Sequence, residues 1–243
     1  MKVPDEIQAI CKAFLNGLRN VLGDNLFGVY LFGAIAFLES GKIRDIDFHV
    51  IINHPLNDLE KSRLKALHEL IAGIYPPLGG ELDGYYILLD DVHKPSPPEH
   101  QFLPGVTDNS WALHRAHLRA GHCFVLVGPD PREIYPEPSW DELAIALKGE
   151  SDYVEKHLDD YPDYCVLNLC RLMYSFSTRD VVTSKRASAK WAIGVFPEYK
   201  RLIEAAVKSY DERITPEEIE LLKSEVYRYF NFACEFIRES YLK

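Results

Sequence analysis

The sequence predicts an α+β protein in which a small sheet flanked by helices precedes an all-helical region. Short apolar runs typical of buried strands occur in the first half of the chain. Stretches of helical character separate these runs. The second half consists of successive helical stretches, with prolines at positions that suit a first helical turn.

In the first half, strand-like runs alternate with helical stretches. The first helix is expected to close near Gly23, and a Pro-rich loop over 93–105 shows no periodicity, which is typical of a lid or a mobile surface excursion. We expect helices at 5–22, 56–75 and 111–120, and strands at 26–33, 45–52, 82–89 and 123–127.

The second half begins after the linker Pro136-Glu-Pro138. Two domains are expected from the length of 243 residues, with boundaries at 1–136 and 137–243. Pro197 and Pro216 suit first-turn positions. We expect helices at 139–148, 150–159, 163–177, 184–195, 197–210 and 215–240.

The pair Asp45 and Asp47 at the start of an apolar, β-branched run is the most informative feature. Side chains two residues apart on a strand point to the same face. Two carboxylates at such a short distance raise each other's pKa, unless a cation between them keeps both ionised. Hard oxygen ligands of this kind suit Mg²⁺ with nucleotide phosphates in its shell. A structural strand-edge pair is the alternative.

Gly33 follows the strand ahead of this pair, where backbone N–H groups can approach a phosphate closely. The order of strand, glycine and Asp-x-Asp strand resembles the nucleotidyltransferase superfamily. The segments Leu126–Pro131, Leu167–Ser175 and Thr183–Ala192 narrow the resemblance to the streptomycin/spectinomycin-type aminoglycoside adenylyltransferases. The resemblance covers about residues 10–238.

This resemblance implies a small mixed nucleotidyltransferase sheet followed by a helical domain, with the active site in the cleft between them. It also implies a third acid on the next strand, as a metal ligand or as general base toward the acceptor hydroxyl. Asp83 matches that position better than Glu81, which lies closer to a Gly-Gly break.

Three residues of the second half are expected at the nucleotide, and the resemblance places two of them, Arg171 and Tyr229, there. Arg171, in an otherwise apolar helix, requires an anion, either a structural carboxylate or the triphosphate. Lys185 follows Ser184 at a helix start, which suits either a phosphate cradle or plain exposure. Tyr229 lies near a nucleotide-contacting tyrosine of the family, although packing in the core is an equal alternative.

The chain departs from the family at two positions. Ala34 replaces the serine whose hydroxyl helps to hold the nucleotide phosphates, a hydrogen bond worth about 1.5–3 kcal/mol. Arg44 replaces a hydroxyl residue before the first aspartate and is expected to supply charge instead. Both residues are therefore assigned to the nucleotide site, with activity retained because the carboxylates are unchanged.

The histidines give weaker signals. His49 shares the strand face of the aspartate pair, which suits either support of a carboxylate or packing beneath the site. His114 and His117 lie three apart on a predicted helix, but surface exposure is the commoner explanation for such a pair.

Composition limits the class of partner. The net charge of −10 argues against a nucleic-acid binder and favours a small cationic acceptor. Five cysteines without Cys-x-x-Cys spacing favour reduced thiols in a cytoplasmic protein. No signal peptide or run of 18 apolar residues is visible, so no membrane partner is expected, and the chain is expected to be a monomer or a weak homodimer.

An acidic stretch supports the cationic acceptor, although a solvated helix face explains it equally well. The stretch contains only two lysines, Lys148 and Lys156. Its acids are Asp141, Glu142, Glu150, Asp152, Glu155, Asp159, Asp160 and Asp163.

The function implied is Mg²⁺-dependent transfer of AMP from ATP to a hydroxyl of an aminoglycoside or aminocyclitol. Asp45, Asp47 and Asp83 form the metal and catalytic site in this hypothesis. Gly33, Ala34, Arg44, Arg171, Lys185 and Tyr229 hold the nucleotide. Two alternatives stay open. One is a nucleotidyltransferase that modifies a protein, of the toxin–antitoxin type. The other is a catalytically lost relative that binds a nucleotide or a partner, which Ala34 favours.

Overall fold

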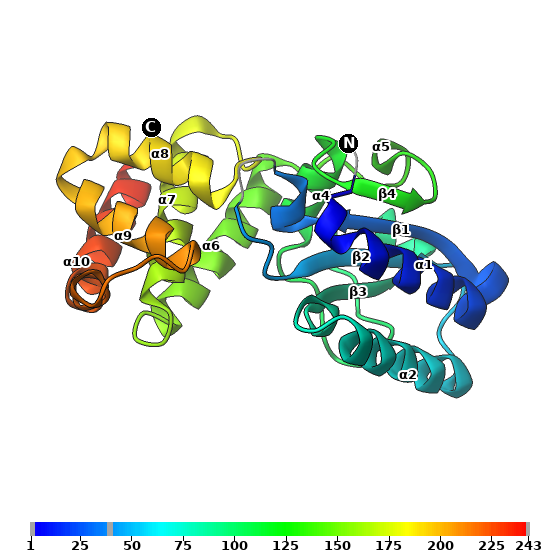
Figure 1. Cartoon of the computed structure of the whole chain (residues 1–243). Helices are drawn as coiled ribbons and strands as arrows, with labels where there is room; N and C mark the ends of the chain where they lie inside the picture. The colour runs from blue at the N-terminus through cyan, green and yellow to red at the C-terminus, as the bar shows by residue number, and fades with distance from the viewer. Residues whose placement is uncertain (1–2, 38–40, 242–243) are drawn as a thin grey trace. The chain divides into compact units, whose positions relative to one another are not determined.

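A computed structural model describes residues 3–37 and 41–241 of the chain (Figure 1). The chain forms two compact units. The first comprises the residues up to Phe37 together with Ile43–Pro138, and the second contains Ser139 onward together with a short segment ending at Lys42. Within the described ranges, none of the helices combines the length and the apolar character that a membrane span requires.

The first unit contains a four-stranded mixed sheet with the strand order β3-β2-β1-β4. Strand β1 (Leu26–Phe32) runs antiparallel to both β2 (Ile46–Ile52) and β4 (Phe124–Val127). Strand β3 (Leu82–Leu88) runs parallel to β2, because α2 (Asp58–Ile74) provides the crossover that a parallel pair requires.

Helices cover both faces of this sheet. Helices α1 (Gln8–Leu22) and α2 pack on one face, against side chains such as Val29, Leu31 and Phe48. The alternate side chains Tyr30, Phe32 and Ile51 join Trp111, at the start of α4 (Trp111–Arg119), in a second cluster on the other face. The remaining short elements of this unit are η1 (Asp5–Ile7), η2 (Gly23–Asn25), η3 (Gly33–Ala36), η4 (Leu78–Gly80), α3 (Leu89–Val92) and α5 (Pro131–Ile134).

The second unit is helical throughout its described part. Helix α7 (Pro162–Thr178) packs against all four other helices of the unit and is apolar on most sides, as a central helix must be. Its neighbours are α6 (Trp140–Lys156), α8 (Lys185–Val195), α9 (Lys200–Tyr210), which the turn η5 (Pro197–Tyr199) precedes, and α10 (Pro216–Tyr241).

The predicted α+β class is confirmed, and most element ends agree with the sequence expectation within two residues. The exception is α6, which is one helix instead of the two expected at 139–148 and 150–159. A capping box between Ser139 and Glu142 starts it, and Gly149 lies inside it without ending it. A glycine in a helix interior costs about 1 kcal/mol relative to alanine, which the buried face of α6 offsets.

Candidate active site

Two acidic side chains lie side by side on neighbouring strands. Asp47 of β2 is in register with Asp83 of the parallel strand β3, and on its other side with Phe32 of β1. Directly opposed residues of two paired strands project to the same face of a sheet. Ile51 belongs to the cluster on the side of the sheet that α4 covers. It is four residues from Asp47 on the same strand, so both acids face that side.

Gly33 ends β1 against Asp47. Its φ of +71° is one that side-chain-bearing residues rarely adopt. A Cβ atom at this position would lie 1.6 Å from Oδ2 of Asp47. The position therefore requires glycine for its conformation and for the close approach of the carboxylate. The neighbouring Ala34 and, just before β2, Arg44 are exposed.

A cavity of about 230 Å³ opens beside the two acids, within the first unit. It combines the ends of β1, β2 and β3 with the segment that leads into α4. Its lining residues are Phe32, Asp47, Asp83, Gly84, Tyr85, Thr107, Asp108, Asn109, Ser110 and His114. Of the two candidates for the third acid, Asp83 lines this cavity, whereas Glu81 is exposed ahead of β3.

The structure brings two of the three predicted acids to this cavity. Asp45 directly precedes β2, is half-buried and is not among the lining residues. Mg²⁺ is usually held by one or two carboxylates, with waters and substrate phosphates completing its shell. The hard oxygen donors of Asp47 and Asp83 fit such a site, and Asp45 lies two residues before Asp47 in the sequence.

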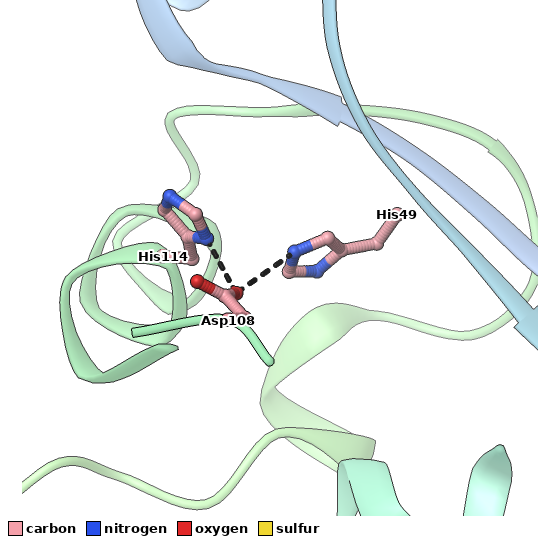
Figure 2. A group of neighbouring side chains, drawn as sticks. All are labelled: His49, Asp108 and His114. Atoms are coloured by element: carbon pink, nitrogen blue, oxygen red, sulfur yellow. Dashed lines mark hydrogen bonds and ion pairs between the residues drawn. The ribbon is translucent and has the colours of Figure 1, made fainter. Parts of the chain in front are cut away.

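A second polar cluster joins β2 to the wall of the cavity (Figure 2). Nδ1 of His114 donates a hydrogen bond of 2.7 Å to Oδ2 of Asp108, and Nε2 of His49 lies 3.6 Å from the same oxygen. On its other side, Nδ1 of His49 is 3.3 Å from the hydroxyl of Tyr135. His49 and Asp108 are buried, and His114 is about three-quarters buried.

Burial and charge shift the pKa values of this cluster in a consistent way. Burial lowers the pKa of His49 to about 4, although Asp108 opposes that shift. Burial alone would raise the pKa of the Asp108 carboxyl, but the charge and hydrogen bond of His114 hold it well below its usual range. Burial, followed by the charges of Asp108 and Asp83, raises the pKa of Tyr85 to about 12. The cavity therefore presents a negative field.

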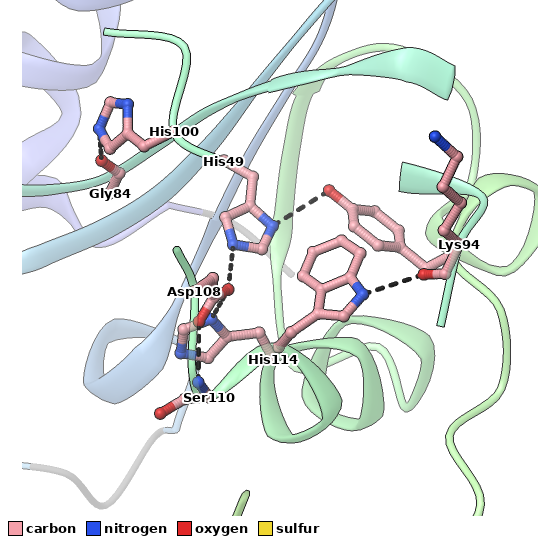
Figure 3. Close-up of polar contacts among 9 residues, drawn as sticks. His49, Gly84, Lys94, His100, Asp108, Ser110 and His114 are labelled. Atoms are coloured by element: carbon pink, nitrogen blue, oxygen red, sulfur yellow. Dashed lines mark hydrogen bonds and ion pairs between the residues drawn. The ribbon is translucent and has the colours of Figure 1, made fainter. Parts of the chain in front are cut away.

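The Pro-rich segment expected to be a lid or a mobile excursion packs on the edge of the sheet. The backbone N–H of Gln101 donates to the carbonyl of Tyr86, and Nε2 of His100 lies 3.1 Å from the carbonyl oxygen of Gly84. Nearer the cavity, the backbone N–H of Ser110 donates to Oδ1 of Asp108 (Figure 3). The first two contacts hold the segment on the edge of β3, and residues 107–110, which follow it, line the cavity.

The three nucleotide-binding candidates of the second half all belong to the helical unit. Arg171 is half-buried and donates a hydrogen bond of 3.4 Å to Oδ1 of Asn168, and no carboxylate of the described chain lies within 4.0 Å of its guanidinium. Nζ of Lys185, at the first position of α8, donates to the hydroxyl of Tyr210 at 2.6 Å and lies 4.3 Å from the ring centroid of Tyr164.

Tyr229 is a core residue, which corrects the expectation that it contacts the nucleotide. Its side chain is fully buried, packs against Tyr199, and its hydroxyl lies 3.2 Å from Sγ of Cys170. The alternative that it packs in the core is the one that the structure favours.

The acidic stretch over 141–163 lies largely on exposed positions of α6 and the turn after it. Three of these acids have partners within the helical unit. Glu142 completes the cap of α6, and Asp152 pairs with Lys148. Asp163 accepts a hydrogen bond from Ser209. Much of the stretch is thus a solvated or internally paired surface.

Sequence reasoning missed Asp108 and undervalued His114. Asp108 lies in a segment without periodicity, and its burial depends on contacts with β2 and α4. The available signal was the i+2 relation of His49 to Asp47, which places an imidazole on the strand face that carries Asp47.

The chain is similar to known adenylyltransferases in sequence. Residues 138–235 match the family described as aminoglycoside adenylyltransferase, C-terminal domain. Spectinomycin 9-adenylyltransferase of Staphylococcus aureus (strain N315) is 26% identical over 219 residues, which cover 79% of this chain and 81% of the relative. The Enterococcus faecalis enzyme of the same name is 24% identical over 218 residues, covering 79% and 83%.

A solved structure shows the same fold. The crystal structure of the Enterococcus spectinomycin adenyltransferase AAD(9), with ATP and spectinomycin, superposes with a TM-score of 0.73 at 19% identity, over 92% of this chain and 97% of that one. The resemblance predicted from the sequence is confirmed: the chain is similar to aminoglycoside adenylyltransferases in the family match of residues 138–235 and in its relatives, and it shares the fold of the solved structure.

Proposed function

We propose that this protein transfers AMP from ATP to a hydroxyl group of an aminocyclitol or aminoglycoside antibiotic. The observation that carries the proposal is the pairing of Asp47 with Asp83 across β2 and β3, beside Gly33 and at the edge of a cavity. Spectinomycin is the first acceptor to consider, because the relatives are spectinomycin 9-adenylyltransferases.

Asp47 and Asp83, with Asp45 at the edge of the site, are the residues that would hold Mg²⁺. A bound magnesium ion supplies charge neutralisation to the phosphates of ATP and to the leaving pyrophosphate. Asp47 is fixed for this role by its close contact with Gly33. The backbone amides of Gly33 and Ala34 are assigned to the outer phosphates, with Arg44 near the start of β2 as an additional charge.

Asp83 is assigned to the acceptor side of the site. Its carboxylate is exposed at the cavity, so it has access to a bound hydroxyl group. It either completes the metal shell or takes the proton as the hydroxyl oxygen attacks the α-phosphorus. In either case the new bond joins the acceptor oxygen to the α-phosphorus, and pyrophosphate leaves from the opposite side.

The charge of the cavity supports a cationic acceptor. Asp47, Asp83 and Asp108 line it, and the chain as a whole carries a net charge of −10. A cavity with several carboxylates and no lysine or arginine among its lining residues concentrates cations. Ammonium groups of an aminocyclitol match that field.

Arg171 and Lys185 are assigned to the triphosphate. Lys185 stands at the N-terminal end of α8, where backbone N–H groups and the helix dipole add to its charge. The guanidinium of Arg171 has only an amide oxygen as its hydrogen-bond acceptor in the described chain, so it keeps donors for a phosphate.

Ala34 supports the second candidate, a relative that binds nucleotide without turnover. Isothermal titration with ATP separates the two. Binding that strengthens with Mg²⁺ supports the enzyme, whereas binding that ignores Mg²⁺ supports the catalytically lost relative.

The direct test is release of pyrophosphate by the purified chain with ATP, Mg²⁺ and spectinomycin or streptomycin. We expect release that depends on the acceptor, and its loss by at least about 100-fold in Asp47→Asn, because the charge at the metal site falls. A folded Asp47→Asn variant with wild-type turnover would contradict the assignment. No release across a broad aminoglycoside panel would contradict the acceptor class.

A further inference from the structure

We propose that His49, Asp108 and His114 form a binding site for one divalent transition-metal ion of the zinc class, next to the Asp47 and Asp83 pair but separate from it. Among the described residues, these three have ligand atoms that all lie within 4.8 Å of one another. They come from β2, from the segment ahead of α4 and from α4 itself, and they converge on one point (Figure 2).

The spacing of the ligand atoms suits a small ion. Zinc lies about 2.0–2.2 Å from nitrogen and oxygen ligands, so tetrahedral ligands are about 3.4 Å apart. Nε2 of His49 and Oδ2 of Asp108 are already 3.6 Å apart. The 2.7 Å hydrogen bond from His114 to Asp108 would open by about 0.7 Å, as the ion replaces the proton on Nδ1.

A buried nitrogen without a hydrogen-bond partner provides independent support. Nε2 of His49 has no hydrogen-bond partner in the described part of the chain, although the side chain is completely buried and this nitrogen is directed at Asp108. Buried polar atoms are normally satisfied, and an unsatisfied one calls for an explanation such as an ion. Coordination would satisfy it.

Tyr135 completes the surroundings of the site. Its hydroxyl lies 3.3 Å from Nδ1 of His49, on the side of the ring away from Asp108. Histidine ligands of metals usually donate their second ring N–H to a neighbouring oxygen, which fixes the tautomer and the ring orientation. A hydrogen bond from Nδ1 to this hydroxyl would leave the lone pair of Nε2 directed at the ion.

The ligand set identifies the class of ion. Two imidazoles and one carboxylate favour Zn²⁺, Co²⁺ or Ni²⁺, whereas the all-oxygen set of Asp47 and Asp83 favours Mg²⁺. Three protein ligands leave a fourth coordination position. Because Asp108 and His114 line the cavity, that position would open onto it and take a water molecule or an oxygen atom of a bound substrate.

Cobalt provides the test, because Co²⁺ in a tetrahedral site absorbs visible light. The full chain would be stripped of metal with a chelator and titrated with Co²⁺ in the absence of nucleotide and acceptor. We expect one equivalent to bind, with displacement by Zn²⁺ and none by a large excess of Mg²⁺. His114→Ala, at a partly exposed position, and His49→Gln should each weaken Co²⁺ binding by at least about tenfold.

Two variants serve as controls. His100→Gln removes a histidine that lies outside the cluster and the cavity lining and whose Nε2 lies 3.1 Å from the carbonyl oxygen of Gly84, so Co²⁺ binding should be unchanged. Asp47→Asn should also leave Co²⁺ binding unchanged, which separates this site from the one proposed for Mg²⁺.

The measurement does not depend on the proposed transferase activity. Wild-type chain that binds no Co²⁺ would overturn the site. So would a folded His114→Ala variant with unchanged affinity, which would leave the cluster as a hydrogen-bonded support for Asp108. Failure of pyrophosphate release, by contrast, would leave the cobalt result intact.

Discussion

Gly33→Ala gives a test of the close contact between the end of β1 and Asp47. The substitution adds one methyl group at a residue with a φ of +71°. The left-handed conformation costs a residue with a Cβ atom about 1–2 kcal/mol. The methyl carbon would also lie 1.6 Å from Oδ2 of Asp47, whereas a non-bonded contact requires more than 3 Å. The carboxylate must therefore move by about 1.5 Å or more.

These two effects have different consequences. The backbone strain lowers the free energy of unfolding, while the displaced carboxylate lowers turnover. A displacement of about 1 Å in a catalytic group can cost about 100-fold in rate. We therefore expect Gly33→Ala to lose at least about 100-fold in kcat, with a loss of about 1–2 kcal/mol in the free energy of unfolding.

Gly121→Ala is the matched control. Gly121 has a similar φ of +81°, but a Cβ atom there would meet no atom within 4 Å. Urea unfolding and steady-state adenylylation of spectinomycin should give similar stability losses for the two variants and a turnover loss for Gly33→Ala alone. Equal turnover in the two variants would refute the reasoning.

The remaining predictions concern the third acid, the aromatic core and the thiols. Asp83→Asn should lower kcat by about 100-fold or more, whereas Glu81→Gln, two residues away and outside the cavity, should leave kcat within twofold, and steady-state kinetics of both variants checks this. Tyr229→Phe should cost about 1 kcal/mol of unfolding free energy through its contact with Cys170 and leave KM for ATP unchanged; a raised KM would restore a nucleotide role. Burial raises the pKa of Cys165 and of Cys170 to about 12, so neither thiol should form appreciable thiolate at pH 8, and mass spectrometry after alkylation should find both unmodified in the native chain and modified after denaturation.

The strands and most helices were predictable because their signals are local. Alternating or continuous apolar runs place β1, β2 and β3 within a residue of their observed ends, and register then follows from which face is buried. The proximity of Asp47 and Asp83 was also predictable from the sequence, because the two residues lie on adjacent strands. The prediction divided α6 into two helices on either side of Gly149. A glycine weakens a helix locally, but packing decides whether the helix continues.

The cluster at Asp108 could not be predicted in the same way. Its three residues are 59 and 6 positions apart along the chain, and they meet only because the segment ahead of α4 folds along the edge of β3. Tyr229 is a second residue whose position could not be predicted from the sequence. Its place in the sequence matched a family position, but its burial depends on how α7 and α10 pack.

The most direct test of the central claim is to follow the α-phosphate of ATP. The purified chain would be incubated with Mg²⁺, spectinomycin and ATP labelled at the α-phosphorus, and the products separated and identified by mass. We predict labelled spectinomycin that carries one AMP group with the wild-type chain, and none with Asp47→Asn. Label that stays in ATP with every aminocyclitol and aminoglycoside tested, or that transfers equally well with Asp47→Asn, would contradict the account.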